Sequence, residues 1–308
     1  MKQNRKNSAA KALLIGSICA AVLAVAASVL YFFAYRNCYD VTFCHYETGC
    51  ALPYIYGFMM LGVAVIFGVV ALYLNRPSVE FSPEVKNRDM FGLWLCAFMF
   101  IVFALYSLFG STADATAVSF KEVTAVGRIC DTLLPPLALL SALSLFLAVS
   151  DRTRCTTLHA VVAFSPVLWA IGLVLKYYFD LDEMTLNDPE LNLTMVALAG
   201  LVVFFLNECR FALGIATAAT TVFAASGAIF LTGGITVARC VLFRTDALVI
   251  PTPIESAVFL ASVVLAVCRL ISLYSHLKHS TPSSDKCCEC ECGCGCCTSD
   301  TSDTDGAL

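Results

Sequence analysis

The chain has 308 residues, of which 59% are hydrophobic and 14% are charged. Soluble domains carry about 25% charged residues, so this chain has too few charges to coat a water-facing surface. Its formal net charge of −4 and its scattered basic residues also argue against a nucleic-acid-binding protein, which needs a basic face. The composition predicts an integral membrane protein whose partner is the lipid bilayer.

The first segment, MKQNRKNSAAK, is basic like the start of a secretory signal peptide. The apolar run after it extends from Ala12 to Ala34, about 23 residues, whereas the apolar core of a signal peptide has about 7–15. We therefore predict a basic cytoplasmic N-terminus at residues 1–9, followed by an uncleaved transmembrane helix.

Eight apolar blocks are long enough to cross a bilayer, which takes roughly 20 mostly apolar residues. They lie near residues 10–35, 51–74, 90–111, 132–150, 157–179, 189–207, 211–236 and 253–275. The predicted fold class is all-α, a polytopic bundle of eight transmembrane helices with short loops. This transmembrane domain covers residues 10–277, and a disordered cysteine-rich tail follows at 278–308, because the tail has almost no apolar residues to bury.

Capping patterns predict where two of these helices begin. Thr252-Pro253-Ile254-Glu255 places Thr at the N-cap, Pro at the first helical position and Glu at the third, so the last helix should begin at Pro253. Asp131-Thr132 resembles an N-cap before Pro135-Pro136, which predicts that both prolines lie in a first turn, where they cost little.

The stretch from residue 189 to about 236 is too long for a single crossing. Asn207-Glu208-Cys209-Arg210 interrupts it with two charges, which prefer the membrane interface to the hydrocarbon. We therefore predict two helices joined by a tight turn at residues 207–210. The second of them repeats small residues every four positions, which is typical of a close-packed central helix or of a mobile helix beside a substrate path.

The distribution of basic residues predicts the orientation. Cytoplasmic loops carry an excess of Lys and Arg, and a cytoplasmic N-terminus gives thirteen such residues inside against six outside. The inside set is Lys2, Arg5, Lys6, Lys11, Arg76, Lys86, Arg88, Arg152, Arg154, Arg210, Arg269, Lys278 and Lys286, and the outside set is Arg36, Lys121, Arg128, Lys176, Arg239 and Arg244. We therefore predict a plasma-membrane protein with both termini in the cytoplasm.

Four polar residues fall at one level near the cytoplasmic ends of their helices: Asn207, Glu208, Arg210 and Arg269. Two interpretations are open. They can anchor the helices at the interface, with a structural Glu208–Arg269 pair, or they can form an inward-facing cluster that binds an anion or a protein partner.

The first outer loop, RNCYDVTFCHYETGC, holds Cys38, Cys44 and Cys50 together with His45. On an oxidising face, two of the three cysteines can form a disulfide. Free thiols, or a zinc or copper site made of thiolate and imidazole ligands, are the alternatives.

The tail contains CCECECGCGCC at residues 287–297, which resembles metallothioneins in local composition. Its seven cysteines are Cys287, Cys288, Cys290, Cys292, Cys294, Cys296 and Cys297. In a reducing cytoplasm these thiols can wrap a soft ion such as Cu(I), Zn(II) or Cd(II). Acylation of the cysteines, or a compositional tract without a function, are the alternatives.

The chain contains no His-Glu-x-x-His, Gly-x-Ser-x-Gly or Walker sequence, and it has four histidines. We therefore predict that it is not an enzyme and needs no resident catalytic cofactor. The function predicted is a structural, sensory or accessory membrane protein with a soft-metal-capable tail. The alternative is a transporter of a small solute or metal ion that uses the tail as a cytoplasmic metal acceptor.

Overall fold

The computed structural model describes residues 2–40, 45–47, 49–75, 87–109, 124–149, 161–179, 189–242 and 252–279. Within these ranges the chain is helical apart from one short hairpin and the turns between elements, and eight helical segments are long and apolar enough to cross a membrane. The predicted fold class is confirmed, and the chain is a polytopic membrane protein. The tail cysteines lie outside the described residues.

The described elements follow the order of the predicted spans. They are α1 (Lys2–Cys38), β1 (Tyr39–Asp40), β2 (His45–Tyr46), α2 (Leu52–Asn75), α3 (Asn87–Phe109), α4 (Ala125–Val149), α6 (Ser165–Phe179), α7 (Pro189–Ala212), α8 (Ala218–Gly227), η5 (Ala228–Gly233), α9 (Gly234–Leu242) and α10 (Pro253–His279). Helices α8, η5 and α9 are continuous and together make the seventh span, in which η5 is a π-helical segment. The strands β1 and β2 pair antiparallel, with Tyr39 opposite Tyr46.

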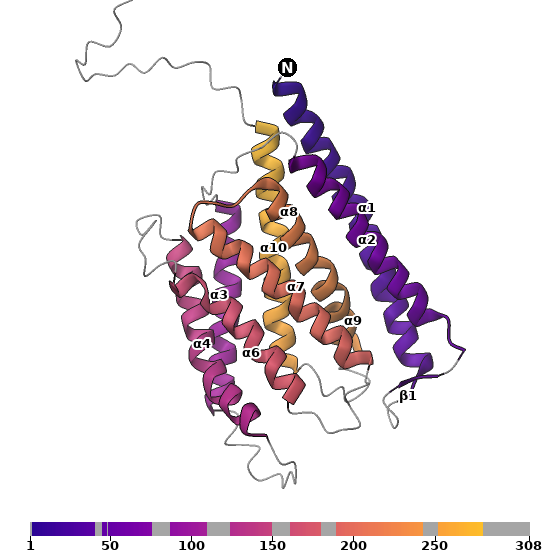
Figure 1. Cartoon of the computed structure of the whole chain (residues 1–308), viewed down its shortest axis with the longest axis vertical. Coiled ribbons are helices and arrows are strands. Elements are labelled where there is room, and N and C mark those ends of the chain that lie inside the picture. Colours follow the sequence, from indigo (N-terminus) through magenta and orange to yellow (C-terminus); the bar gives the residue numbers. More distant parts are fainter. Residues whose placement is uncertain are drawn as a thin grey trace, which may run out of the picture.

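Helix α10 runs through the middle of the bundle (Figure 1). It packs on one side against α3, which contacts α4, and on the other against η5, α8 and α1. The pair α1 and α2 forms the opposite edge of the bundle from α4 (Figure 1). The N-terminus and the end of α10 lie at the same end of the bundle, which we call the termini end (Figure 1). We call the other end, where Cys38 and Cys50 are joined, the disulfide end.

The core is aromatic, and the outer surface is apolar as well. Trp169 is fully buried and meets Phe100 edge-on, with 4.9 Å between the ring centroids. On α2, Phe58 and Leu72 are 74% and 70% exposed. In water such a surface would be an aggregation site. In a bilayer it contacts acyl chains of matching polarity, as expected for helices that face lipid.

The start of α10 is confirmed and the start of α4 is not. The Thr252 amide donates to Glu255 Oε2 at 2.7 Å, and α10 begins at Pro253 as predicted. Helix α4 instead begins at Ala125, so the prediction that Pro135-Pro136 lie in a first turn is wrong. The cap is Thr124, whose Oγ1 accepts from the Gly127 amide at 3.1 Å, while Asp131 lies inside the helix and pairs with Lys176 of α6, 2.7 Å away.

The break between the sixth and seventh spans exists, but it lies later than predicted. Helix α7 continues through Asn207 and Arg210 to Ala212, and residues 213–217 make the turn. Gly214 has a φ of 72°, a left-handed conformation that glycine adopts without strain. Thr217 then caps α8 in a capping box with Thr220. The helix passes Glu208 because that charge is paired with Arg269, so it has no need to reach water.

Candidate functional site

The termini end holds a buried ion cluster that joins three helices. We call Asp89 (α3), Glu208 (α7), Arg269 and Ser272 (both α10) the termini-end cluster. The Arg269 Nη2 and Nε atoms donate to Glu208 Oε2 and Oε1 at 2.7 and 3.0 Å, and Nη1 lies 3.3 Å from Asp89 Oδ2. Ser272 donates to the same Asp89 oxygen at 2.9 Å. The cluster therefore ties α3, α7 and α10 together with one cation and two carboxylates.

The four residues predicted to form an inner polar cluster are thus divided. Glu208 and Arg269 meet, and the Arg269 guanidinium also lies over the Phe211 ring, 4.7 Å from its centroid. Arg210 is exposed, and its Nη2 donates to the carbonyl of Ile215 at 3.4 Å. Asn207 is 2% exposed, and neither atom of its amide has a hydrogen-bond partner among the described residues.

A second buried cluster lies at the disulfide end, and the sequence did not predict it. We call Tyr31, Tyr46, Glu190, Thr194 and Arg239 the disulfide-end cluster. Arg239 is 1% exposed. Its Nη2 donates to Glu190 Oε2 and to the Glu190 carbonyl, both at 2.9 Å, its Nη1 donates to Thr194 Oγ1 at 2.7 Å, and its Nε donates to the Tyr31 hydroxyl at 3.0 Å. Helices α1, α7 and α9 are therefore joined through one guanidinium.

Two tyrosines complete the coordination of the Glu190 carboxylate. Tyr31 donates to Oε2, and Tyr46 donates to Oε1 at 2.6 Å. Burial and the negative charge of Glu190 raise the pKa of Tyr46 well above its ordinary value. The hairpin that carries Tyr46 is thereby attached to the transmembrane bundle. One signal for this cluster was available in the sequence, namely two opposite charges at the same predicted level of the membrane.

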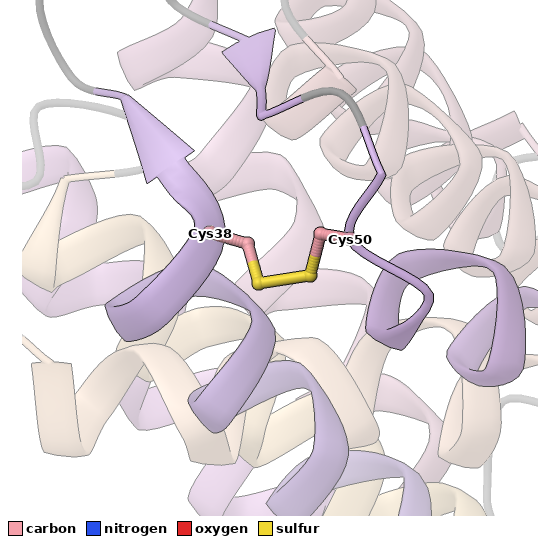
Figure 2. Close-up of a disulfide and its surroundings, with 2 residues drawn as sticks. All are labelled: Cys38 and Cys50. Atoms are coloured by element: carbon pink, nitrogen blue, oxygen red, sulfur yellow. A yellow bond between two sulfur atoms is a disulfide. The ribbon is translucent and has the colours of Figure 1, made fainter.

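The disulfide joins Cys38, the last residue of α1, to Cys50, two residues before α2 (Figure 2). Its two Cα atoms are 6.2 Å apart. Of the other candidate ligands in this loop, Cys44 lies outside the described residues and His45 lies in β2. Within the described ranges no group of three or more His, Cys, Asp or Glu side chains is arranged to hold a metal ion.

The two clusters and the disulfide describe an integral membrane protein whose buried charges connect helices. No protein-family model, curated protein or solved structure matches the chain. The candidate sites therefore rest on the chemistry of this chain alone.

Proposed function

We propose that the protein is a non-catalytic, multi-pass membrane protein with a structural or accessory role and a soft-metal-binding tail. The observation that carries this proposal is that Arg239 and Arg269 use their guanidinium groups in hydrogen bonds and ion pairs between helices. A proton-coupled transporter or an enzyme needs ionisable groups that a ligand can reach. Here the guanidinium nitrogens of Arg239 already donate to four acceptors while 1% of the residue is exposed.

We place both termini in the cytoplasm and the disulfide end outside the plasma membrane. Two independent arguments support this orientation. The thirteen-to-six distribution of basic residues favours the termini side as cytoplasmic. Disulfides persist in oxidising compartments, and the Cys38–Cys50 bond lies at the opposite end of the bundle.

The tail then meets a reducing compartment, where its seven cysteines stay available as thiolate ligands for Cu(I), Zn(II) or Cd(II). A labelling experiment tests the orientation on which this depends. With an impermeant thiol reagent, the tail should stay unlabelled in intact cells and become labelled after permeabilisation. Strong labelling of the tail in intact cells would overturn the orientation.

The second candidate function is transport, and the π-helical segment η5 favours it. π-helical turns inside α-helices frequently occur at functional sites. Here η5 lies in the small-residue helix, which contacts α2, α7 and α10. In this alternative the segment changes its hydrogen bonding as a metal or small solute passes, and the tail accepts the metal.

Metal analysis combined with a flux measurement separates the two functions. The full-length protein and a variant with all seven tail cysteines replaced by Ser are purified, exposed to Cu(I), Zn(II) or Cd(II) under reducing conditions, and analysed for bound metal. We expect metal on the wild type and not on the variant, and no flux of these ions in proteoliposomes made with either protein. Flux would favour the transporter, and equal metal content in the two proteins would overturn the tail assignment.

A further inference from the structure

A groove runs along the bundle between α2 and α7, with α8 and η5 as its floor. It consists of three adjoining hollows of about 520, 280 and 390 Å³. The first and second share Val203 and Phe223 in their linings, and the second and third share Met60 and Val196. The shared side chains place the hollows next to one another, so that together they extend from the termini end to the disulfide end. We call this path the α2–α7 groove.

The α2–α7 groove is apolar and open to the surroundings of the bundle along most of its length. Leu72, Phe223 and Val196 line it and are 70%, 56% and 46% exposed. A lipid-facing position explains both the exposure and the apolar character, because a chain of methylene groups can lie against these side chains.

The termini end of the groove is different, because polar groups gather there. Asn75, Asn207, Arg210 and Thr220 all line the first hollow. The amide of Asn207 is the most informative, since it is almost fully buried and its Oδ1 and Nδ2 have no partner among the described residues. Buried polar atoms without partners are costly and rare in native proteins. A phosphate oxygen at this end of the groove would accept from Nδ2, and a headgroup hydroxyl would donate to Oδ1.

Two further features make this end of the groove favourable for an anion. Arg210 is exposed and carries a permanent positive charge. Ala219 and Thr220, in the first turn of the ten-residue helix α8, also line the hollow. The N-terminus of a helix carries a partial positive charge, which stabilises phosphate groups. The Thr220 amide already donates to Thr217, so α8 acts on the phosphate through this charge.

We propose that the α2–α7 groove binds one anionic phospholipid. Its phosphate lies at the termini end against Arg210, Asn207 and the first turn of α8, and an acyl chain extends along the hollows toward the disulfide end. Basic pockets between transmembrane helices bind lipid headgroups in this way. A soluble anion would leave the two apolar hollows without a ligand.

The test uses the full-length protein, delipidated in detergent and titrated with phosphatidylglycerol or phosphatidylcholine while bound lipid is counted by native mass spectrometry. We expect one site that prefers phosphatidylglycerol. Arg210→Gln should lower the affinity for phosphatidylglycerol about fivefold, the effect of one basic residue near an anionic headgroup, and Arg210→Lys should retain most of it. Equal affinity for the two lipids, or an Arg210→Gln variant that binds like the wild type, would overturn the proposal.

Two glycines on α2 provide a matched pair of variants. A Cβ atom added at Gly62 or at Gly68 meets no other atom within 4 Å, so a side chain can start at either position without a clash. Gly68 lines the first hollow, whereas Gly62 lines none of the three. Gly68→Leu should weaken phosphatidylglycerol binding about tenfold by filling the groove, and Gly62→Leu should leave it unchanged. Equal effects of the two variants would contradict a site in this groove.

Asn207→Leu gives a readout that does not depend on counting lipids. Removing an unpartnered buried amide should raise the Tm of the delipidated protein and reduce the further rise in Tm that phosphatidylglycerol produces. A fall in the Tm of the delipidated variant, with an unchanged response to lipid, would assign Asn207 a purely structural role and overturn its part in the site. Glycerol phosphate serves as the soluble control, and binding as tight as that of phosphatidylglycerol would overturn the lipid assignment.

Discussion

The two ends of the bundle each bury one arginine, but the two arginines have different partners. At the disulfide end, Arg239 faces the single carboxylate of Glu190, and two tyrosine hydroxyls and a threonine satisfy the remaining atoms. At the termini end, Arg269 is shared between Glu208 and Asp89, and Asp89 Oδ1 has no hydrogen-bond partner among the described residues.

This difference indicates which end of the bundle is rigid. The disulfide-end cluster balances one positive and one negative charge, and a covalent bond between Cys38 and Cys50 closes the same end. The termini-end cluster has one carboxylate more than it has cations and leaves an acceptor unused. We infer that substitutions cost more at the disulfide end. The termini end, where the α2–α7 groove has its polar residues, is the more tolerant end.

The largest expected effect is that of Arg239→Met. This change leaves the Glu190 carboxylate buried without its cation, and breaking a buried ion pair from one side costs about 3–5 kcal/mol of unfolding free energy. Thermal or denaturant unfolding in detergent micelles measures it. Arg36→Met is the control, because Arg36 lies at the same end of the bundle but is exposed. Equal stability of the two variants would remove the basis for a rigid disulfide end.

The covalent bond at this end should have the next largest effect. Replacing Cys38 and Cys50 together by Ser opens a loop that spans 12 positions in sequence, which corresponds to about 3 kcal/mol of loop-closure entropy. Unfolding of the oxidised wild type and of the double variant is compared. Cys44→Ser is the control and should behave like the wild type; a large loss from Cys44→Ser would mean that Cys44 takes part in the disulfide.

The same comparison shows what the sequence could predict. The eight spans were predictable because a bilayer core leaves a long apolar segment no stable backbone conformation except the helix. The start of α10 was predictable because its capping box is local, within Thr252–Glu255. The start of α4 was missed because Asp131 looked like a cap, whereas the cap is Thr124, seven residues earlier.

The clusters could not be predicted in full because they depend on which faces of distant helices pack together. The Glu208–Arg269 pair was one of the open interpretations. Asp89 was not among the candidate residues, because no sequence pattern in α3 shows that this helix packs against α10. Glu190 was not a candidate residue either. A negative charge in the first turn of a helix is favourable by itself, so Glu190 gave no sign of a partner. The structure shows that Arg239, 49 residues later, is its partner.

A smaller effect is expected from Tyr46→Phe, and it depends on pH. The variant loses the hydrogen bond to Glu190, at a cost of about 1.5 kcal/mol for a bond to a charged acceptor. The folded protein holds the Tyr46 proton more tightly than the unfolded chain, so this contribution is complete at pH values below about 10 and is lost as the pH rises above it. The stability of the wild type should therefore fall faster than that of the variant, by about 1.4 kcal/mol per pH unit. Parallel curves above about pH 10 would contradict the burial of Tyr46 against Glu190.

The smallest effect is expected at the termini end, from Asp89→Asn. This substitution removes the surplus negative charge and keeps an oxygen that accepts from Ser272 and Arg269, so the unfolding free energy should change by less than about 1 kcal/mol. Glu190→Gln is the matched change at the disulfide end. It removes the acceptor of the Tyr46 hydroxyl and the counter-charge of Arg239, so we expect a loss of about 2–3 kcal/mol. If Asp89→Asn costs as much as Glu190→Gln, the surplus carboxylate at the termini end is as necessary as the balanced one. The inference that the termini end tolerates substitution would then be wrong, because both arginines would require every carboxylate that surrounds them.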